Sequence, residues 1–270
     1  MSIKKIKYTI WKIIFTPKIS LFFSKFSYGQ FLLKTGRKKI KQNILEKYFS
    51  EFEVKRGPFK AMKLLKANYN IDSILPKLSG SYEFEIQEII NQLVKKNYKN
   101  ILNIGSAEGY YLVGFALKIP SSNIIGFETE QANRDLSRRM SQLNNVSGRI
   151  EIFGNADESS ILGLDRMDNI LIFSDCEGAE LDIFSFEVIE KFKNADFLIE
   201  THDCFRPGLT NELQIRFEST HQIQVINWIT NDKRPVFSPS NCKLSFVEKF
   251  HLSEERREVN NGWIFCRSKS

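Results

Sequence analysis

The chain has 270 residues, of which 42% are hydrophobic, and this is enough to bury one good-sized core. Its four cysteines show no Cys-x-x-Cys spacing, which argues against a zinc site or a disulfide framework and favours a reducing compartment. The net charge of +7 is uneven, because residues 1–70 contain 17 Lys and Arg against 3 Asp and Glu, and the rest contains 22 against 29. We therefore predict a basic, largely helical N-terminal arm and lead-in at residues 1–80 and an acidic domain at residues 81–270.

The arm alternates apolar and basic side chains over most of its first half. No apolar run reaches the roughly 18 residues that a bilayer-spanning helix needs, and Lys12 and Lys18 interrupt any signal-peptide core. Pro17 is expected to divide the segment into two short helices. Two interpretations stay open, a basic amphipathic helix lying on an anionic membrane or a helical arm packed on the domain with its lysines in solvent. We expect a cytoplasmic protein, which is peripheral to the membrane under the first interpretation.

Residues 55–82 are rich in turn signals, and helical spacing of apolar residues begins at Phe84. From there, strands and helices alternate. Strands are predicted at 100–104, 123–127, 149–153, 169–174 and 196–200, and helices near 108–118, 130–143, 178–193 and 210–219. The last two strands, at 222–229 and 262–267, enclose only a short helix near 252–259 and can pair as an antiparallel hairpin. The pattern predicts an α/β, Rossmann-like, doubly wound seven-stranded sheet that ends in this hairpin.

A glycine turn follows the first of these strands, in the order Gly105-Ser106-Ala107-Glu108-Gly109. Such a junction places backbone N–H groups at the carboxyl edge of a parallel sheet, where α/β proteins bind nucleotide-like ligands. The two glycines match neither the three-glycine dinucleotide motif nor the phosphate-binding loop. The turn therefore favours S-adenosylmethionine, which needs no cradled phosphate. The alternative is an ordinary strand-to-helix turn.

Acidic residues follow the next two strands. Glu128 ends the second strand, where a carboxylate can accept hydrogen bonds from two ribose hydroxyls at once. Asp157 follows the third strand, where it could accept a hydrogen bond from an adenine amino group or cap the next helix. The sequence leaves both roles of Asp157 open.

Three carboxylates, those of Asp175, Glu177 and Glu180, surround the glycine turn after the fourth strand. Like charges are costly to place together, which indicates a role for at least one of them. We expect Asp175 to face the cleft, whereas Glu177 and Glu180 can instead be first-turn charges of the next helix.

The fifth strand ends in Glu200, followed by His202 and Asp203. These residues fit methyl transfer to an oxygen, for which the protein aligns the hydroxyl and removes its proton. His202, or a carboxylate such as Asp175, could be the general base. Alternatively, Asp175 with Glu200 or Asp203 could hold Mg²⁺, which would lower the pKa of the hydroxyl. The sequence does not choose between these chemistries.

Residues 80–204 resemble the FkbM-type S-adenosylmethionine-dependent methyltransferases, and the tail to residue 267 is compatible with them. The matching motifs are Asn103–Tyr111, Phe127-Glu128, Asp175-Cys176-Glu177-Gly178-Ala179-Glu180 and Glu200-Thr201-His202-Asp203. The resemblance implies an O-methyltransferase that acts mostly on sugar or polyketide hydroxyls, with Asp175, Glu200 and His202 as catalytic candidates. The candidates for binding the cofactor are Asn103, Gly105, Ser106, Gly109, Glu128 and Asp157. The family usually has Asp at the position of Asn103, where Asn keeps the hydrogen-bonding shape and loses the charge.

Three functions compete on these observations. The leading one is O-methylation of a saccharide or glycan-type acceptor, with the basic arm holding the enzyme near the membrane or an acidic glycan. The second is an RNA methyltransferase whose arm binds the phosphate backbone. It is less favoured, because the arm contains no recognisable RNA-binding module and the domain is acidic. The third is a non-catalytic binding protein that retains the fold.

Overall fold

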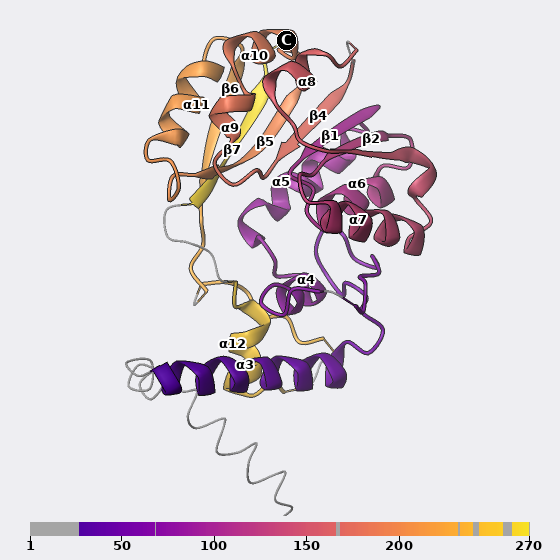
Figure 1. Ribbon diagram of the computed structural model, residues 1–270, viewed down its shortest axis with the longest axis vertical. Coiled ribbons are helices and arrows are strands. Elements are labelled where there is room, and N and C mark those ends of the chain that lie inside the picture. The colour runs from indigo at the N-terminus through magenta and orange to yellow at the C-terminus, as the bar shows by residue number, and fades with distance from the viewer. Residues whose placement is uncertain are drawn as a thin grey trace, which may run out of the picture.

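The computed structural model describes residues 27–67, 69–165, 168–231, 233–239, 243–255 and 261–269, with side chains from residue 35 onward. The predictions for the first 26 residues, including the helix break at Pro17, lie outside the described residues. A sheet covered by helices on both faces forms the larger part of the molecule, and a smaller helical lobe lies at one end (Figure 1). The lobe is built around α3 (Ser27–Tyr48), α4 (Ile74–Ser79) and α12 (Phe246–Ser253).

The sheet has seven strands in the order β3-β2-β1-β4-β5-β7-β6. The strands are β1 (Asn100–Ile104), β2 (Asn123–Phe127), β3 (Ile150–Phe153), β4 (Ile170–Ser174), β5 (Asp196–His202), β6 (His221–Asn227) and β7 (Asn261–Ser268). The first five strands pair in parallel, whereas β7 lies antiparallel between β5 and β6. The Rossmann-like doubly wound sheet and its terminal antiparallel pair are therefore confirmed.

The remaining helices follow the predicted alternation. They are α5 (Phe84–Lys95), α6 (Tyr110–Lys118), α7 (Gln131–Leu143), α8 (Glu158–Leu162), α9 (Glu180–Ile183), α10 (Phe186–Lys191) and α11 (Leu209–Phe217). The single helix predicted at 178–193 is wrong, because Ser185 begins a new helix by accepting a hydrogen bond from the Val188 N–H at 3.2 Å.

The helix predicted near 252–259 begins earlier than expected. Ser245 and Glu248 form a reciprocal capping box, in which the Ser245 N–H donates to the Glu248 carboxylate at 2.8 Å. This cap starts α12 at Phe246, and the helix ends at Ser253. The capping signal of Ser245 and Glu248 is present in the sequence, and the predicted range begins after it.

Two apolar clusters fill the two faces of the sheet, because successive side chains of a buried strand point to opposite faces. On β1, Ile101 packs in the cluster under α5 and α6, whereas Leu102 packs in the cluster under α10 and α11. The first cluster continues into the lobe through Leu75 and Leu78 of α4. The sheet and the lobe therefore share one hydrophobic core.

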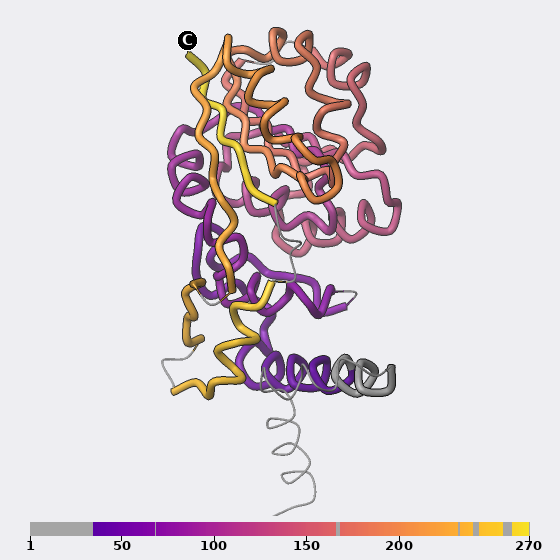
Figure 2. The backbone as a smooth tube through the Cα atoms, turned by 90° about the vertical axis from the view of Figure 1, so that its left-hand side faces the viewer, coloured from indigo at the N-terminus to yellow at the C-terminus, as the bar shows by residue number. Residues whose placement is uncertain are grey.

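The lobe joins segments that are far apart in sequence. Glu248 of α12 accepts hydrogen bonds from Lys47 at 2.8 Å and from the Tyr48 hydroxyl at 3.0 Å, both at the end of α3. The Ser81 hydroxyl donates to the Leu252 carbonyl at 2.8 Å. Figure 2 shows α12 (yellow) beside α3 (indigo) at the end of the molecule opposite the sheet. The β6–β7 connection thus packs on the N-terminal lead-in.

Helix α3 packs one of its sides on the rest of this lobe. Its residues Ile40, Ile44 and Leu45 are buried, whereas Lys38 and Lys39 are exposed. Lys41 on the same helix is instead buried and forms ion pairs with Asp72 and Glu254. Both interpretations of the arm stay predictions. Among the helices of the described residues, none is long and apolar enough to serve as a membrane span.

Candidate active site

The carboxyl ends of β1, β2, β4 and β5 meet at one edge of the sheet and border two adjoining cavities, of about 340 Å³ and 350 Å³. We call them the first and the second cavity. The first is bounded by the loops after β1, β2, β3 and β4, and the second opens between the sheet and the lobe. Ala107, Asp175 and Glu177 line both cavities. The two cavities therefore adjoin at these three residues.

The glycine turn brings two strand ends close together beside the first cavity. Gly105 has a φ of 73°, and a Cβ added there would lie 1.8 Å from the Asp175 carbonyl oxygen. Its N–H donates to the Phe127 carbonyl at 2.9 Å, which ties the turn to the end of β2. Gly109 has a φ of 94° and packs against Ser137. Both glycines are required by backbone geometry, which is compatible with either interpretation of the turn.

Two residues of the shared wall have strained backbones. Ala107 has a φ of 45° and Glu177 a φ of 54°, and both values lie in the left-handed region that non-glycine residues rarely adopt. Such conformations persist only where the surrounding structure imposes them, and they concentrate at functional sites. Both residues lie where the two cavities meet.

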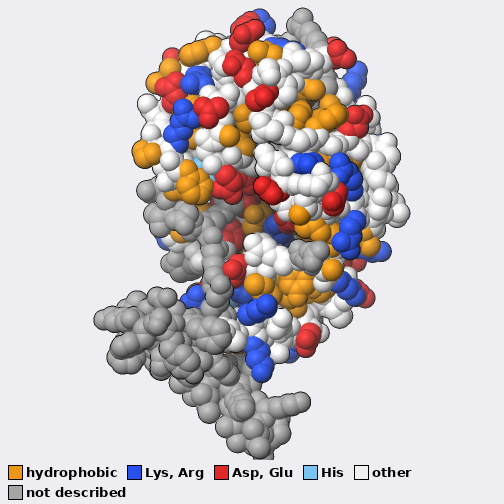
Figure 3. All heavy atoms as spheres, viewed as in Figure 1, with side chains coloured by type: hydrophobic (Ala, Val, Ile, Leu, Met, Phe, Trp, Pro, Cys, Tyr) orange, Lys and Arg blue, Asp and Glu red, His pale blue; other side chains and the backbone are white. Residues whose placement is uncertain are grey.

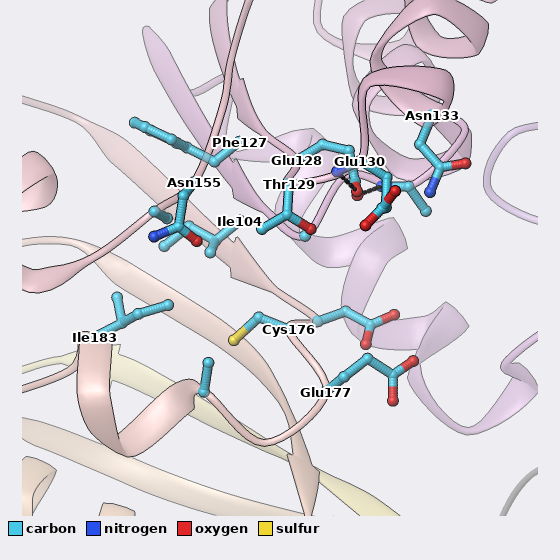
Figure 4. A pocket seen from close by; sticks show the side chains of 15 residues that line it. Ile104, Phe127, Glu128, Thr129, Glu130, Asn133, Asn155, Cys176, Glu177 and Ile183 are labelled. Carbon is cyan, nitrogen blue, oxygen red and sulfur yellow. Dashed lines mark hydrogen bonds between the residues drawn. The ribbon is translucent and has the colours of Figure 1, made fainter.

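Glu128 is held rigidly at the edge of the first cavity. It is 8% exposed, and its two carboxylate oxygens accept hydrogen bonds from the N–H groups of Ala107 and Glu130, each at 2.8 Å. Each carboxylate oxygen keeps a second lone pair, so the group can still accept from two hydroxyls. Figure 4 shows it beside Thr129 with Asn155 across the same space. The placement fits the predicted role at a ribose.

Asp157 lies away from the lining of the first cavity. Its carboxylate accepts hydrogen bonds from the Ser160 N–H and the Ser159 hydroxyl, both at 2.8 Å, and caps α8. These bonds lower the pKa of Asp157. Of the two roles left open by the sequence, the structure favours the helix cap. Asn155, two residues earlier, does line the cavity, and sequence analysis missed it although it directly follows the glycine after β3.

Asn103 is buried in β1 and Ser106 in the glycine turn, and neither residue lines either cavity. The side-chain oxygen and nitrogen of Asn103 and the hydroxyl of Ser106 have no hydrogen-bond partner among the described residues. Asn103 is fully buried in β1, where a charged Asp would pay a larger desolvation cost than the neutral amide. Their predicted role in binding the cofactor stays a prediction.

His202 lies at the end of β5 and faces the second cavity. Its Nδ1 lies 2.7 Å from a carboxylate oxygen of Glu180, which is fully buried at the start of α9. Its Nε2 lies 3.5 Å from carboxylate oxygens of both Asp175 and Glu177 and 3.9 Å from one of Glu200. The structure thus brings together the three predicted catalytic residues, and it adds Glu180.

Electrostatics in this cluster favour positive charge. Burial works to lower the pKa of His202, but the hydrogen bond and charge of Glu180 and the charges of Asp175 and Glu177 outweigh it and raise the pKa. Burial, followed by the charge of Glu180, raises the pKa of the Cys176 thiol, so this cysteine is a poor nucleophile. Figure 3 shows acidic side chains gathered around the hollow between the sheet and the lobe.

Asp203 is not part of the cluster. One of its carboxylate oxygens accepts from the Gly208 N–H at 3.0 Å, and the group also accepts from Thr210 at the start of α11. Asp175, Glu200 and His202 instead offer ligand atoms that all lie within 4.8 Å of one another. The sequence could not distinguish Asp203 from Glu200, because both neighbour the end of β5 and only the fold decides which side chain turns inward.

The strand order, with an antiparallel β7 between β5 and β6, is that of a Rossmann-like sheet with a terminal antiparallel pair. No protein-family model matches the chain, and no curated protein matches its sequence. The FkbM resemblance therefore stays a prediction.

Several solved structures are similar to this one. The O-methyltransferase TomG from Streptomyces achromogenes, in complex with S-adenosylmethionine, is 11% identical, with a TM-score of 0.47 over 67% of this chain and 77% of that one. An O-methyltransferase from Bacillus cereus is 11% identical, with a TM-score of 0.46 over 85% and 90% of the two chains. One from Thermotoga maritima is 16% identical, with a TM-score of 0.45 over 70% and 66%. Identities of this size say nothing about the activity of this chain.

Proposed function

We propose that the chain is an S-adenosylmethionine-dependent O-methyltransferase whose acceptor is a saccharide or a glycan-type molecule. The observation that carries the proposal is the pair of adjoining cavities, which share Ala107, Asp175 and Glu177. The first has the features of a nucleoside site, a glycine turn and a rigid carboxylate, that of Glu128. The second contains the groups that can handle the proton of a hydroxyl.

The residues of the first cavity fit the cofactor. Glu128 would hold the ribose hydroxyls, and the turn at Gly105 lets a ligand approach the backbone closely. When bound, S-adenosylmethionine supplies an electrophilic methyl group, which the acceptor oxygen takes up as it loses its proton and the carbon–sulfur bond breaks with both electrons on sulfur. The chain itself contributes alignment across the shared wall and removal of that proton.

The lining of the second cavity supports a hydroxyl-rich acceptor. Asn70, Ser73 and Asn261 offer amide and hydroxyl groups, and the rings of Tyr82 and Phe205 offer flat apolar surfaces. Polar groups that set orientation beside aromatic surface suit a sugar ring. The excess of carboxylates in this cavity would repel a phosphate backbone, which favours a glycan over RNA.

Two ways of removing the proton follow from the sequence, a general base or a metal ion. For the base, Glu180 holds Nδ1 of His202, so that Nε2 faces the acceptor cavity. For a metal, the predicted Mg²⁺ would lie between Asp175 and Glu200.

Calorimetric titration of the purified chain with S-adenosylmethionine and S-adenosylhomocysteine tests the proposal. We expect micromolar binding to the wild type and a loss of at least tenfold in Glu128→Ala. Glu151→Ala is the matched control, because it removes an exposed carboxylate from the neighbouring strand β3. Absence of binding by the folded wild type would refute the proposed enzymatic activity and leave the interpretation of a non-catalytic binding protein.

We further propose that the lobe contacts an anionic membrane, together with the basic arm. In its support, Phe246 is 67% exposed on α12, and Phe250 and Lys249 on the same helix are also exposed. Aromatic rings beside lysines are typical of helices that lie at a membrane surface. The chain should sediment together with phosphatidylglycerol vesicles at low salt and should stay in the supernatant at high salt. Equal retention on neutral phosphatidylcholine vesicles, or none on either, would refute the contact.

A further inference from the structure

The His202 cluster has spacings that hydrogen bonds do not explain. Charge-assisted hydrogen bonds to imidazole are about 2.7–2.9 Å long. Nδ1 fits this range, with Glu180 at 2.7 Å. Nε2 does not, because the carboxylate oxygens of Asp175, Glu177 and Glu200 stand 3.5, 3.5 and 3.9 Å away. Three acceptors surround one nitrogen, and none of these three distances is that of a short hydrogen bond.

These spacings match ligands around a shared cation. A divalent transition metal binds imidazole nitrogen and carboxylate oxygen at about 2.0–2.2 Å, so two tetrahedral ligands lie roughly 3.4 Å apart. The ligand atoms of Asp175, Glu200 and His202 all lie within 4.8 Å of one another, and Glu200 and His202 are almost fully buried. Two further contacts point the same way.

The first contact is the Glu180–His202 hydrogen bond. A histidine that binds a metal through one ring nitrogen almost always donates from the other to a carboxylate or carbonyl, which fixes the tautomer and raises the basicity of the ligand. Glu180 is fully buried and makes this bond at 2.7 Å. The tautomer with hydrogen on Nδ1 leaves the lone pair of Nε2 directed at the carboxylates.

The second contact lies on the neighbouring strand. Asn261 pairs with His202 across β5 and β7 and lines the same cavity. Its buried side-chain oxygen has no hydrogen-bond partner among the described residues. A bound water on a metal, or an acceptor hydroxyl held by it, would supply the missing donor.

The charge balance also calls for a cation. Four carboxylates, those of Asp175, Glu177, Glu180 and Glu200, lie within 4.0 Å of one imidazole. Lys77, the lysine that lines this cavity, pairs with Glu108, which lines it too. A divalent ion would offset two of these four negative charges.

We propose that Asp175, Glu200 and His202 bind one divalent transition-metal ion, with Glu180 as the positioning residue of His202. The imidazole ligand favours an ion such as Mn²⁺ or Zn²⁺ over Mg²⁺, which prefers oxygen ligands alone. The inference rests on the proposed function, since such an ion lowers the pKa of an acceptor hydroxyl bound to it. Glu177, whose side chain is 73% exposed at the open side of the cluster, can then accept the proton.

Calorimetric titration of the chelator-treated full chain with Mn²⁺, Zn²⁺ and Mg²⁺ tests this site directly. We expect one equivalent of Mn²⁺ or Zn²⁺ to bind at least tenfold more tightly than Mg²⁺. His202→Gln and Asp175→Asn should abolish stoichiometric binding, and Glu180→Gln should weaken it about 10- to 100-fold. Asp203→Asn is the matched control, because this neighbouring carboxylate turns toward α11, and it should bind like the wild type.

Titration of the same metal-free protein with S-adenosylhomocysteine separates the two proposals. Cofactor binding without any stoichiometric metal binding would overturn the metal site and leave the proposed function with His202 as its base. Metal binding that survives both His202→Gln and Asp175→Asn would also overturn the site. Metal binding without cofactor binding would support the metal site and refute the proposed function. Melting curves of each variant, matched to the wild type, establish that a lost signal is not a lost fold.

Discussion

The two cavities that meet at Asp175 are built in opposite ways. The first is lined by one stretch of the chain, from Ile104 to Ile183, and a short turn with two glycines and the residue after the next strand form its ligand edge. The second draws on distant segments, which include the lead-in before α5, the ends of β4 and β5, and the β6–β7 connection. The first cavity thus depends on backbone geometry and the second on side chains that tertiary packing brings together.

The largest expected effect on stability comes from a buried ion-pair network beside the second cavity. Arg234 is completely buried and forms ion pairs with Glu85, at 3.1 Å, and with Glu255, which lines the cavity. Arg234→Met leaves two buried carboxylates without this cation and should lower the free energy of unfolding by about 3–5 kcal/mol. Arg206→Met, which breaks an exposed pair with Asp182, should cost about 0–1 kcal/mol.

Urea denaturation measures both variants. Titration with S-adenosylhomocysteine then sharpens the comparison, because the folded Arg234→Met protein should keep the first cavity intact. A change in cofactor affinity as large as that in Glu128→Ala would mean that the two cavities are not built independently.

The next effect concerns the turn of the first cavity. Gly105→Ala places a methyl group 1.8 Å from the Asp175 carbonyl oxygen at a left-handed φ, and it should destabilise the fold by about 3 kcal/mol. Gly154→Ala is the control, because a Cβ there meets nothing within 4 Å. Equal unfolding free energies for the two variants would contradict the tight approach of the two loops.

Low pH should destabilise the lobe. Burial favours a raised pKa for Glu254, but the hydrogen bond from His251 and the charge of Lys41 outweigh it and lower the pKa to about 2. At Glu248 the hydrogen bond from Lys47 likewise overcomes burial, and the pKa is about 2. Because both values lie below the usual 4.5, the stabilisation is complete above that pH and is lost as the pH falls toward 2.

Urea denaturation at pH 6 and pH 3 measures this loss, which we expect to be about 2 kcal/mol for Glu254. The loss at Glu248 should be smaller, because its partner Lys47 is 59% exposed. Glu254→Gln should be less stable at pH 6 and should depend less on pH. A pH dependence identical to that of the wild type would show that Glu254 keeps its ordinary pKa in the folded chain.

The smallest effect separates the two roles of Asp157. Because its carboxylate caps α8, Asp157→Ala should lower the melting temperature slightly and leave the affinity for S-adenosylmethionine unchanged. Asn155→Ala, from the same loop, should instead weaken cofactor binding, since this side chain lines the first cavity. A tenfold loss of affinity in Asp157→Ala would restore the adenine role.

The sequence by itself determined the sheet and the ligand edge of the first cavity. Strand and helix periods, the turn at Gly105 and the placement of Glu128 are local signals, and each describes groups that are close in the chain. It also placed Asp175, Glu200 and His202 at neighbouring strand ends, because parallel strands that end together bring such residues to one edge.

Only the tertiary structure decided the partners of those residues. Glu180 could be a first-turn charge or the partner of His202, and Asp203 could turn inward or cap a helix; the sequence fits each equally well. The lobe and the pairing of Asn261 with His202 depend on contacts between segments far apart in the chain. Which side chains point into a shared space is set by packing across the whole fold, and no local pattern encodes it.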